Sequence, residues 1–333
     1  MAGSHARRAG RLCAIHRARR EATPSARFVR SPSGPRRDRC ARRIAHRRSD
    51  LHFRRRPRVD CSRRRVEESG LRSGVAYIGD GNAQANMGVA IGDYDNDGLI
   101  DLLTTTFSED YFPLFRQSRP GLYEDVSSSA GLGTITLPWV GWATGFTDFD
   151  NDGWKDLWLA NGHVYPKADR LPNSSYLQPL VVMRNTAGRF SQEPGILDPP
   201  LLGSYRGGAV GDFNNDGKMD LVILPIDGPP LLLENDTQTH NNWIGLHLRG
   251  TRTNRDGIGA FVRVEACGKF QVDTVRNGGS YLSHDDPRLH FGLGNCESVE
   301  RVVVRWQGGK EQVVSRPAIN RYTTVREPLT NVP

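Results

Sequence analysis

The stretch that decides the fold is Asp93-Tyr94-Asp95-Asn96-Asp97-Gly98-Leu99-Ile100-Asp101, because the chain repeats its pattern twice. The later copies are Asp148-Phe149-Asp150-Asn151-Asp152-Gly153-Trp154-Lys155-Asp156 and Asp212-Phe213-Asn214-Asn215-Asp216-Gly217-Lys218-Met219-Asp220. Oxygen-bearing side chains stand at positions 1, 3, 5 and 9, and the glycine at position 6 permits the positive φ of a sharp turn. Alternate placement turns these oxygens toward one centre, which predicts a site for a hard divalent cation.

The donor set favours Ca²⁺ over Mg²⁺, because Ca²⁺ accepts six to eight oxygen ligands. We predict that side chains at positions 1, 3, 5 and 9 bind it together with the backbone carbonyl of position 7. The predicted ligands are Asp93, Asp95, Asp97, Leu99 and Asp101; Asp148, Asp150, Asp152, Trp154 and Asp156; and Asp212, Asn214, Asp216, Lys218 and Asp220. Without a cation, the carboxylates of one loop would repel one another. Asn214 removes one charge from the third loop, so we expect weaker binding there.

The loops are not EF-hands, because position 12 is Thr104, Leu159 or Ile223 instead of a bidentate Glu. Strand-forming residues follow each loop, and small residues occupy every second position before it. These small residues are Gly88, Ala90 and Gly92; Ala143, Gly145 and Thr147; and Gly207, Ala209 and Gly211. A period of two predicts a strand with one nearly bare face, as is needed where backbones crowd around a propeller axis.

This order of strand, acidic loop, strand and outer hairpin resembles the FG-GAP/VCBS β-propeller repeat. Outer hairpins are expected at 114–126 and 182–190, and the loops begin 55 and 64 residues apart. The resemblance covers residues 65–240 and implies calcium loops that tie inner strands together, with a structural rather than catalytic role. Three blades cannot close a propeller. The chain is therefore expected to hold the C-terminal part of one.

Residues 241–327 change character, with alternating strand patterns at 243–248, 260–264 and 301–306. The order of the segments 254–260, 277–283 and 288–294 resembles the ASPIC/UnbV domain. The predicted fold class is all-β: a partial β-propeller followed by a small β-sandwich-like domain. This arrangement is similar to the cartilage acidic protein-like family, which includes bacterial members linked to enediyne biosynthesis.

Residues 1–64 resemble nothing in the repeats. Residues 1–72 contain 23 Arg, no Lys and 6 acidic residues, whereas the remainder has 22 basic and 31 acidic residues, a net charge of −9. A nucleic-acid-binding arm, a transit peptide and a disordered tail compete as interpretations. We favour a wrong reading frame or start, because residues 66–71 resemble the close of the first full repeat, at 126–132. No signal peptide or membrane-spanning segment is readable.

Several other groups admit a functional and a structural interpretation. The aromatic residues Trp139, Trp142, Trp154, Trp158 and Tyr165 could stack on sugar rings, but strand alternation favours blade packing for most of them. His163 has no nucleophile partner in the sequence, so we expect a structural role.

Residues 284–286 are expected to form a turn before Pro287. Cys267 and Cys296 have no zinc-type spacing, and we favour two buried thiols over a disulfide.

The function predicted from these features is that of a calcium-stabilised binding or adhesion module, extracellular or periplasmic in its native setting, with a protein or glycan ligand. A nucleic-acid partner is not expected for the acidic repeat region. The alternative is an enzyme or accessory subunit in secondary-metabolite biosynthesis. No nucleophile–base pair is visible, so the non-enzyme interpretation is favoured. The oligomeric state is not indicated.

Overall fold

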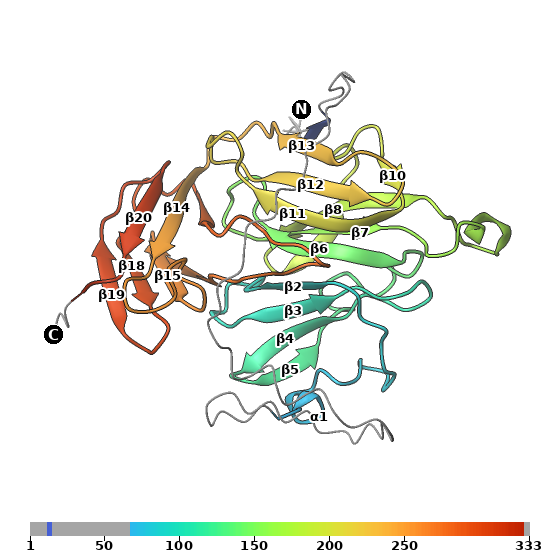
Figure 1. Ribbon diagram of the computed structural model, residues 1–333, viewed down its shortest axis with the longest axis horizontal. Coiled ribbons are helices and arrows are strands. Elements are labelled where there is room, and N and C mark those ends of the chain that lie inside the picture. Colours follow the sequence, from blue (N-terminus) through green and yellow to red (C-terminus); the bar gives the residue numbers. More distant parts are fainter. Residues whose placement is uncertain (1–11, 15–66, 330–333) are drawn as a thin grey trace, which may run out of the picture. The chain divides into compact units, whose positions relative to one another are not determined.

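Nearly every regular element between residues 67 and 329 is a β-strand (Figure 1). The computed structural model describes residues 12–14 and 67–329. In that part of the chain, the helical elements are the short α1 (Gly70–Ser73) and the 3-10 turn η2 (Ala168–Arg170), and the strands form five sheets. The described residues from Gly70 onward belong to one compact unit. The predicted all-β class is confirmed.

Three sheets are propeller blades, and each begins with two strands that flank an acidic loop. Blade one contains β2 (Val89–Gly92), β3 (Asp101–Thr104), β4 (Leu114–Arg119) and β5 (Leu122–Asp125). Blade two contains β6 (Gly141–Thr147), β7 (Asp156–Asn161), β8 (Gln178–Thr186) and β9 (Arg189–Gln192), and β10 (Leu202–Gly203) also pairs with β8. Blade three contains β11 (Tyr205–Gly211), β12 (Asp220–Pro225) and β13 (Leu231–Asn235).

The Arg-rich segment 1–64 contributes one described strand, β1 (Leu12–Ala14), which pairs antiparallel with β13. The rest of that segment lies outside the described residues, and our interpretation of it stays a prediction.

The inner strands have the same register in all three blades. The residue just before each loop pairs with the position-9 Asp: Gly92 with Asp101, Thr147 with Asp156 and Gly211 with Asp220. Strand β6 contacts both β2 and β11, so the inner strands lie side by side.

Two of the small residues in and beside these strands, Gly88 and Gly145, are required by crowding. A Cβ on Gly88 would lie 1.9 Å from the Trp142 carbonyl oxygen, and one on Gly145 would lie 2.6 Å from Trp158 Nε1. The predicted close approach of backbones is confirmed at Gly88, whereas Gly145 is crowded by a side chain.

Two apolar cores hold the blades together, and β7 contributes to both. Every residue of β7 is buried. Leu157 and Leu159 belong to the core shared with blade one, whereas Trp158 and Ala160 belong to the core shared with blade three. This alternation follows from the two-residue period of a strand that is covered on both faces.

The C-terminal residues form a two-sheet sandwich. One sheet contains β17 (Leu289–Gly294), β14 (Asn242–Arg249) and β20 (Tyr322–Arg326), with β14 and β20 parallel. The other contains β16 (Lys269–Thr274), β15 (Phe261–Ala266), β18 (Arg301–Arg305) and β19 (Glu311–Ser315). Ile244, Val262, Phe291 and Val304 are members of the buried core between them.

Residues 276–288, which connect β16 to β17, leave the sandwich and run along the inner strands of the blades. We call them the axial segment; Figure 1 shows this excursion between β2 and β11. Ser280 and Val89 exchange backbone hydrogen bonds of 2.8 and 3.2 Å, and the Ser280 hydroxyl accepts the Thr144 N–H. Ser283 Oγ accepts the Gly208 N–H, and Asp285 Oδ1 accepts the Val210 N–H. All three inner strands therefore contact this one segment.

The crowding around Gly88 predicts that Gly88→Ala destabilises the protein by about 1–3 kcal/mol, the usual range for overpacking. The control is Gly228→Ala, where a Cβ would meet only Pro225 Cγ, at 3.4 Å. Urea unfolding of both variants measures the difference. Equal stabilities would contradict the tight contact between β2 and β6.

Candidate metal centres on the three acidic loops

Each acidic loop is closed by its position-1 carboxylate, which accepts two backbone N–H groups of the same turn. In loop two (148–156), Asp148 accepts the N–H of Asp152 at 3.2 Å and of Gly153 at 2.9 Å. Asp93 and Asp212 make the corresponding bonds in loop one (93–101) and loop three (212–220), at 3.0–3.2 Å and 2.9–3.1 Å. The glycine at position 6 has φ between 86° and 92° in all three loops.

The position-9 carboxylate joins each loop to the third strand of its blade. Asp101, Asp156 and Asp220 each accept the N–H of position 2 and an N–H from β4, β8 or β13. The strand donors, all at 2.8 Å, are Gln117, Asn185 and Asn235. The repeated sequence is therefore also a repeated hydrogen-bonded geometry.

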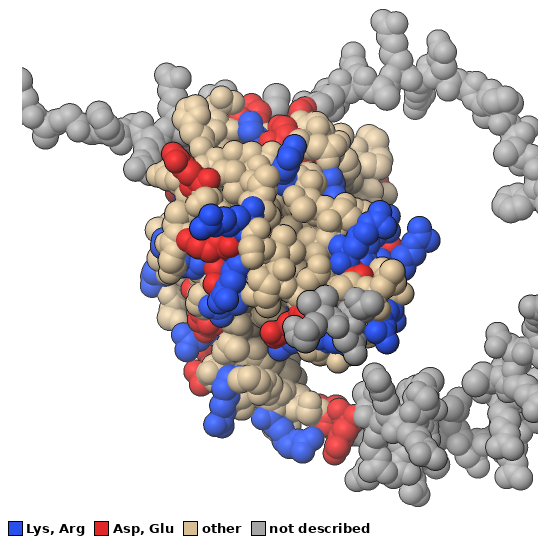
Figure 2. Space-filling view, turned by 90° about the vertical axis from the view of Figure 1, so that its left-hand side faces the viewer, with Lys and Arg blue, Asp and Glu red and all other residues tan. Residues whose placement is uncertain are grey.

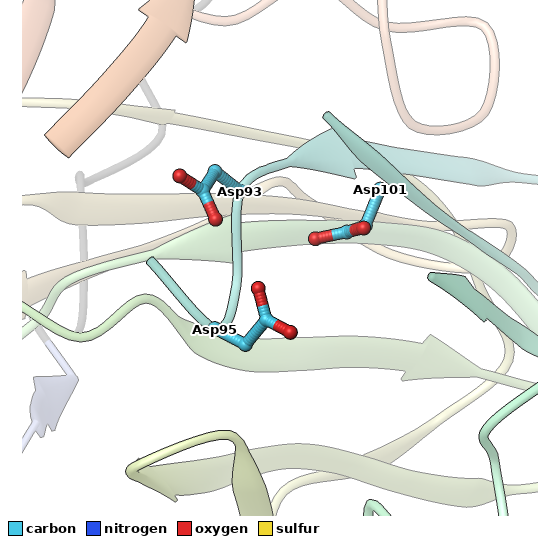
Figure 3. Close-up of side chains that lie close together, drawn as sticks. All are labelled: Asp93, Asp95 and Asp101. Carbon is cyan, nitrogen blue, oxygen red and sulfur yellow. The ribbon is translucent and has the colours of Figure 1, made fainter. Parts of the chain in front are cut away.

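The carboxylates converge in loops one and two. Oxygens of Asp93, Asp95 and Asp101 all lie within 4.8 Å of one another, and Figure 3 shows the three side chains around a common space. Asp148, Asp150 and Asp152 satisfy the same limit in loop two. Ligands about 2.3–2.6 Å from one ion lie at most about 5 Å apart, so both groups fit a single Ca²⁺.

The other predicted ligands lie in the same loops but outside these groups of three. Asp97 Oδ1 accepts the Leu99 N–H at 2.8 Å, as Asp152 Oδ1 accepts the Trp154 N–H, and Asp156 makes the bonds described above. Among the described residues, loop three forms no group of three acids, because position 3 is Asn214. The carbonyls of Leu99, Trp154 and Lys218 stay predictions as ligands.

Burial makes the negative charge of these loops costly. It raises the pKa of Asp93 to about 7 and that of Asp101 to about 8. In loop two, burial first and neighbouring carboxylates second raise the pKa of Asp148 well above its usual range, and that of Asp152 to about 6. Burial also raises the pKa of Asp220. A bound cation would reverse this preference for the protonated form.

Position 3 of each loop has a charged partner on the blade's third strand. The partner is an Arg in loops one and two and a Glu in loop three. Arg184 Nη1 lies 2.6 Å from Asp150 Oδ2, and Arg116 Nη1 lies 4.0 Å from Asp95 Oδ2. In loop three, Asn214 Nδ2 donates instead to Glu234 Oε1, at 3.3 Å.

An Asp–Arg pair has thus become an Asn–Glu pair. Glu234 restores the negative charge that Asn214 removes, but Arg288 contacts the same loop at Asn215 Oδ1 and at the Asp212 carbonyl. The weaker binding expected at loop three therefore stays a prediction.

The position-4 asparagines, which our ligand assignment passed over, link the loops. Asn96 Nδ2 donates to the Gly153 carbonyl, and Asn151 Nδ2 donates to the Gly217 carbonyl, both at 2.9 Å. The third, Asn215, accepts from Arg288 Nη1 of the axial segment, at 2.5 Å. All three have φ of 57–58°, a conformation that Asn tolerates. The sequence did contain a signal for this role, because position 4 is Asn in all three copies.

The cysteine prediction is wrong, because Cys267 and Cys296 form a disulfide with a Cα–Cα distance of 6.0 Å.

The aromatic residues divide between packing and exposure. Trp158 is fully buried, as expected, whereas Tyr165 is 64% exposed. Trp142 lies between the Arg206 guanidinium, 4.1 Å from its ring, and Tyr281, at a centroid distance of 4.8 Å.

His163 is buried and its Nδ1 accepts the Tyr165 N–H, which fits the structural role predicted for it. Asp286 Oδ1 accepts the Arg288 N–H, and the chain bends at residues 287–288 instead of at the expected 284–286. The hydrogen bond that Asp285 accepts from the Val210 N–H of β11 was not expected.

Comparison with known families agrees with the two-part organisation. Residues 148–223 match the family described as FG-GAP-like repeat, and residues 250–332 match the family described as ASPIC and UnbV. The chain thus carries FG-GAP-like repeats followed by an ASPIC/UnbV domain, as the motifs predicted. Loop one lies before the matched range, and its geometry places it with the other two.

The chain is also similar to cartilage acidic protein 1 from several vertebrates. It is 28% identical to the Homo sapiens protein over 243 residues, which covers 70% of this chain and 34% of that protein. It is 26% identical to the Xenopus tropicalis protein over 241 residues, which covers 68% of this chain and 34% of that protein. The chain therefore spans about a third of the length of these relatives.

One solved structure, an exo-beta-1,3-galactanase from Phanerochaete chrysosporium, aligns with a TM-score of 0.29 at 9% identity, covering 74% of this chain and 53% of that one. A likeness at this level supports no conclusion about fold or function.

The raised pKa values predict an unusual pH dependence when a chelator keeps the loops free of cation. The folded-state pKa values of Asp93 and Asp101 lie above the ordinary 3.8. Their contribution to stability is therefore full below about pH 4 and is lost as pH rises through about 7–8. Asp273, whose pKa is lowered to about 2, does not titrate in this window. Burial lowers the pKa of His290 to about 3, which has the opposite effect on stability below about pH 6.5, so the test compares the slopes of wild type and variant.

We expect the melting temperature in chelator to fall between about pH 5 and pH 8, and saturating calcium to flatten that slope. Asp93→Asn should reduce the slope in chelator, whereas Asp236→Asn, at an exposed position outside the loops, should not. Thermal melts at several pH values measure this. A slope in chelator that Asp93→Asn leaves unchanged would contradict the desolvated state of loop one.

Proposed function

We propose that this chain is a calcium-stabilised binding module in which the three acidic loops hold Ca²⁺ and the rigid blades present a surface to a protein or glycan. The observation that carries the proposal is the same buried, hydrogen-bonded carboxylate geometry at three places in register. In loops one and two, three acidic oxygens lie within 4.8 Å of one another. Acidic turns that are exposed to water would have no reason to bring their carboxylate oxygens this close together.

Bound Ca²⁺ supplies positive charge that offsets the desolvated carboxylates. The chain's own residues set its position: the position-1 and position-9 carboxylates are held by backbone N–H groups, which leaves their remaining lone pairs for the ion. Asp150 is paired with Arg184, so a cation there shares this carboxylate with a guanidinium. Each filled loop would fix the turn between two inner strands and thereby the blade. We assign the ions a structural role.

Three features support an extracellular or periplasmic setting. The Cys267–Cys296 disulfide persists in oxidising compartments. Calcium loops of extracellular modules have Kd values of about 10⁻⁴–10⁻³ M, so millimolar calcium outside the cell would fill them. The vertebrate relatives are named after cartilage, which supports the same setting. In the described residues no helix is long and apolar enough to cross a membrane.

We assign the partner surface to the end of the blades away from the acidic loops. The connection from β7 to β8 exposes Tyr165, Leu171 and Leu177, and the tip of the axial segment exposes Leu282. Leu282 is 91% exposed and has a φ of 48°, a strained backbone conformation for a large apolar residue. Exposed apolar and aromatic side chains of this kind are typical of contact surfaces.

A nucleic-acid partner is not proposed. Residues 73–333 carry a net charge of −9. On the face shown in Figure 2, basic and acidic residues are interspersed and form no continuous basic stripe.

The test is calcium-dependent stability of the full chain. Binding to the folded form adds about 2.7 kcal/mol at a hundredfold excess over Kd, so the melting temperature should rise from micromolar to millimolar calcium. Asp148→Asn should remove a large part of this rise. The corresponding change in loop three, Asp212→Asn, should remove less of it, because position 3 of that loop is Asn214. Asp80→Asn, at an exposed turn, is the matched control and should leave the rise intact.

Terbium provides an independent measurement. Trp154 lies within loop two, so terbium bound there should show sensitised luminescence that calcium displaces and that Asp152→Asn weakens. A melting curve indifferent to calcium, together with no terbium signal, would refute the calcium proposal.

A further inference from the structure

The ASPIC/UnbV domain lies directly on the acidic loops. In loop three, the Tyr322 hydroxyl donates to Asp212 Oδ2 at 2.9 Å, so a position-1 carboxylate is bonded by a residue from the other domain. Arg288 Nη2 donates to the Asp212 carbonyl at 2.8 Å, and its guanidinium stacks on the Tyr322 ring at 4.0 Å. These two side chains orient the first ligand position of the loop.

Loop two is covered by the backbone of β17. A Cβ on Gly292 would lie 2.0 Å from Asp148 Oδ2, so only glycine allows this approach. The Gly294 N–H donates to the Asn151 carbonyl at 2.8 Å, and His290 Nε2 lies 3.0 Å from Asn151 Oδ1. The side of loop two that carries Asp148 is thus closed by the second domain.

A buried ion pair adds to this interface. Lys155, at position 8 of loop two, lies 2.5 Å from Asp273 Oδ2 in β16, and both side chains are about nine-tenths buried. Arg276 Nη1 also pairs with Asp273, at 2.7 Å. Burial alone would raise the pKa of Asp273, but Lys155 and Arg276 lower it, so the carboxylate is charged.

From these contacts we infer that the ASPIC/UnbV domain supplies the outer shell of the cation sites in loops two and three, so that cation binding and docking of this domain stabilise each other. Tyr322 and Arg288 are positioning residues for loop three, and Gly292 is the closing contact for loop two. The inference rests on the proposed calcium function and adds to it that the sites are completed by a second domain.

Cation binding and domain docking should favour each other, because docking excludes water from the loop carboxylates. When the domain docks, Asp148 and Asp212 lose contact with water and their negative charge becomes more costly. A cation offsets that cost, so docking is more favourable with the loops filled. Outer-shell hydrogen bonds also fix the orientation of ligand carboxylates, and their loss typically weakens metal binding 10–100-fold. Because linkage is reciprocal, weakening the docked state must weaken cation binding by the same factor.

The first test is Tyr322→Phe in the full chain, titrated with Ca²⁺ by calorimetry. The change removes the hydroxyl that bonds Asp212 and keeps the ring under Arg288, so the fold is retained. We expect one class of sites to weaken by about tenfold. The matched control is Tyr176→Phe, which removes a 3.0 Å hydroxyl–carboxylate bond to Asp227 away from the loops and should leave the isotherm unchanged.

A second measurement follows the docking of the ASPIC/UnbV domain on the loops. Hydrogen exchange of the full chain should slow with calcium at the amides of Gly294 and Asp286, which donate to Asn151 and Val210 across the interface. Amides of the β15–β18 ladder, inside the sandwich, should change much less. Gly292→Ala should abolish the calcium-dependent slowing, because its Cβ prevents β17 from reaching Asp148.

The outcomes separate the two proposals. Absence of calcium binding by the wild-type chain would refute the proposed function. Calcium binding by the wild type with an unchanged isotherm in Tyr322→Phe, and equal exchange at Gly294 with and without calcium, would overturn the coupling and leave the calcium function standing.

Discussion

The repulsion among carboxylates that are held together out of water is the constraint on which the structure depends. Asp93, Asp148 and Asp212 are almost fully buried, and each sits where an inner strand turns back. The turns are closed by N–H donors to these carboxylates, so the chain cannot relieve the repulsion by moving them into solvent without opening the turn. The register of the inner strands, the spacing of the blades and the position of the second domain all depend on these three carboxylates. Charge compensation at the loops is therefore a property of the whole fold.

Much of the fold could be predicted because the relevant signals are local and repeated. The two-residue period of small side chains before each loop reports the inner strands, and Gly88 and Gly145 are small for the steric reason that the period implied. The loop ligand pattern needs only nine consecutive residues.

The features that sequence reasoning missed depend on which distant segments meet. The Cys267–Cys296 disulfide requires that two segments 29 residues apart be adjacent, and their spacing contains no such information. The exchange of Arg184 for Glu234 opposite position 3 becomes meaningful only when the third strands are aligned. Tyr322 lies 110 residues from the Asp212 that it bonds. No local pattern marks it as part of a loop site.

The position-4 asparagines explain how the second domain ends the series of blades. Asn96 reaches the glycine carbonyl of the next loop, and Asn151 does the same. For Asn215 there is no further loop in the described chain, and Arg288 of the axial segment bonds its side chain instead. The ASPIC/UnbV domain thus takes the place of a following loop.

The second domain replaces the contacts of a following loop but not those of a following blade. The aromatic residues at position 2 of the loops demonstrate this difference. Tyr94 is buried against Phe190 of blade two, with ring centroids 5.6 Å apart, and Asn185 donates to its carbonyl. Asn235 of blade three donates to the Phe149 carbonyl in the same way. Phe213, in loop three, is 56% exposed. In the described part of the chain, the second domain bonds polar groups of the last loop but does not bury its position-2 aromatic residue. Phe213 is thus exposed where Tyr94 and Phe149 are each buried against the following blade.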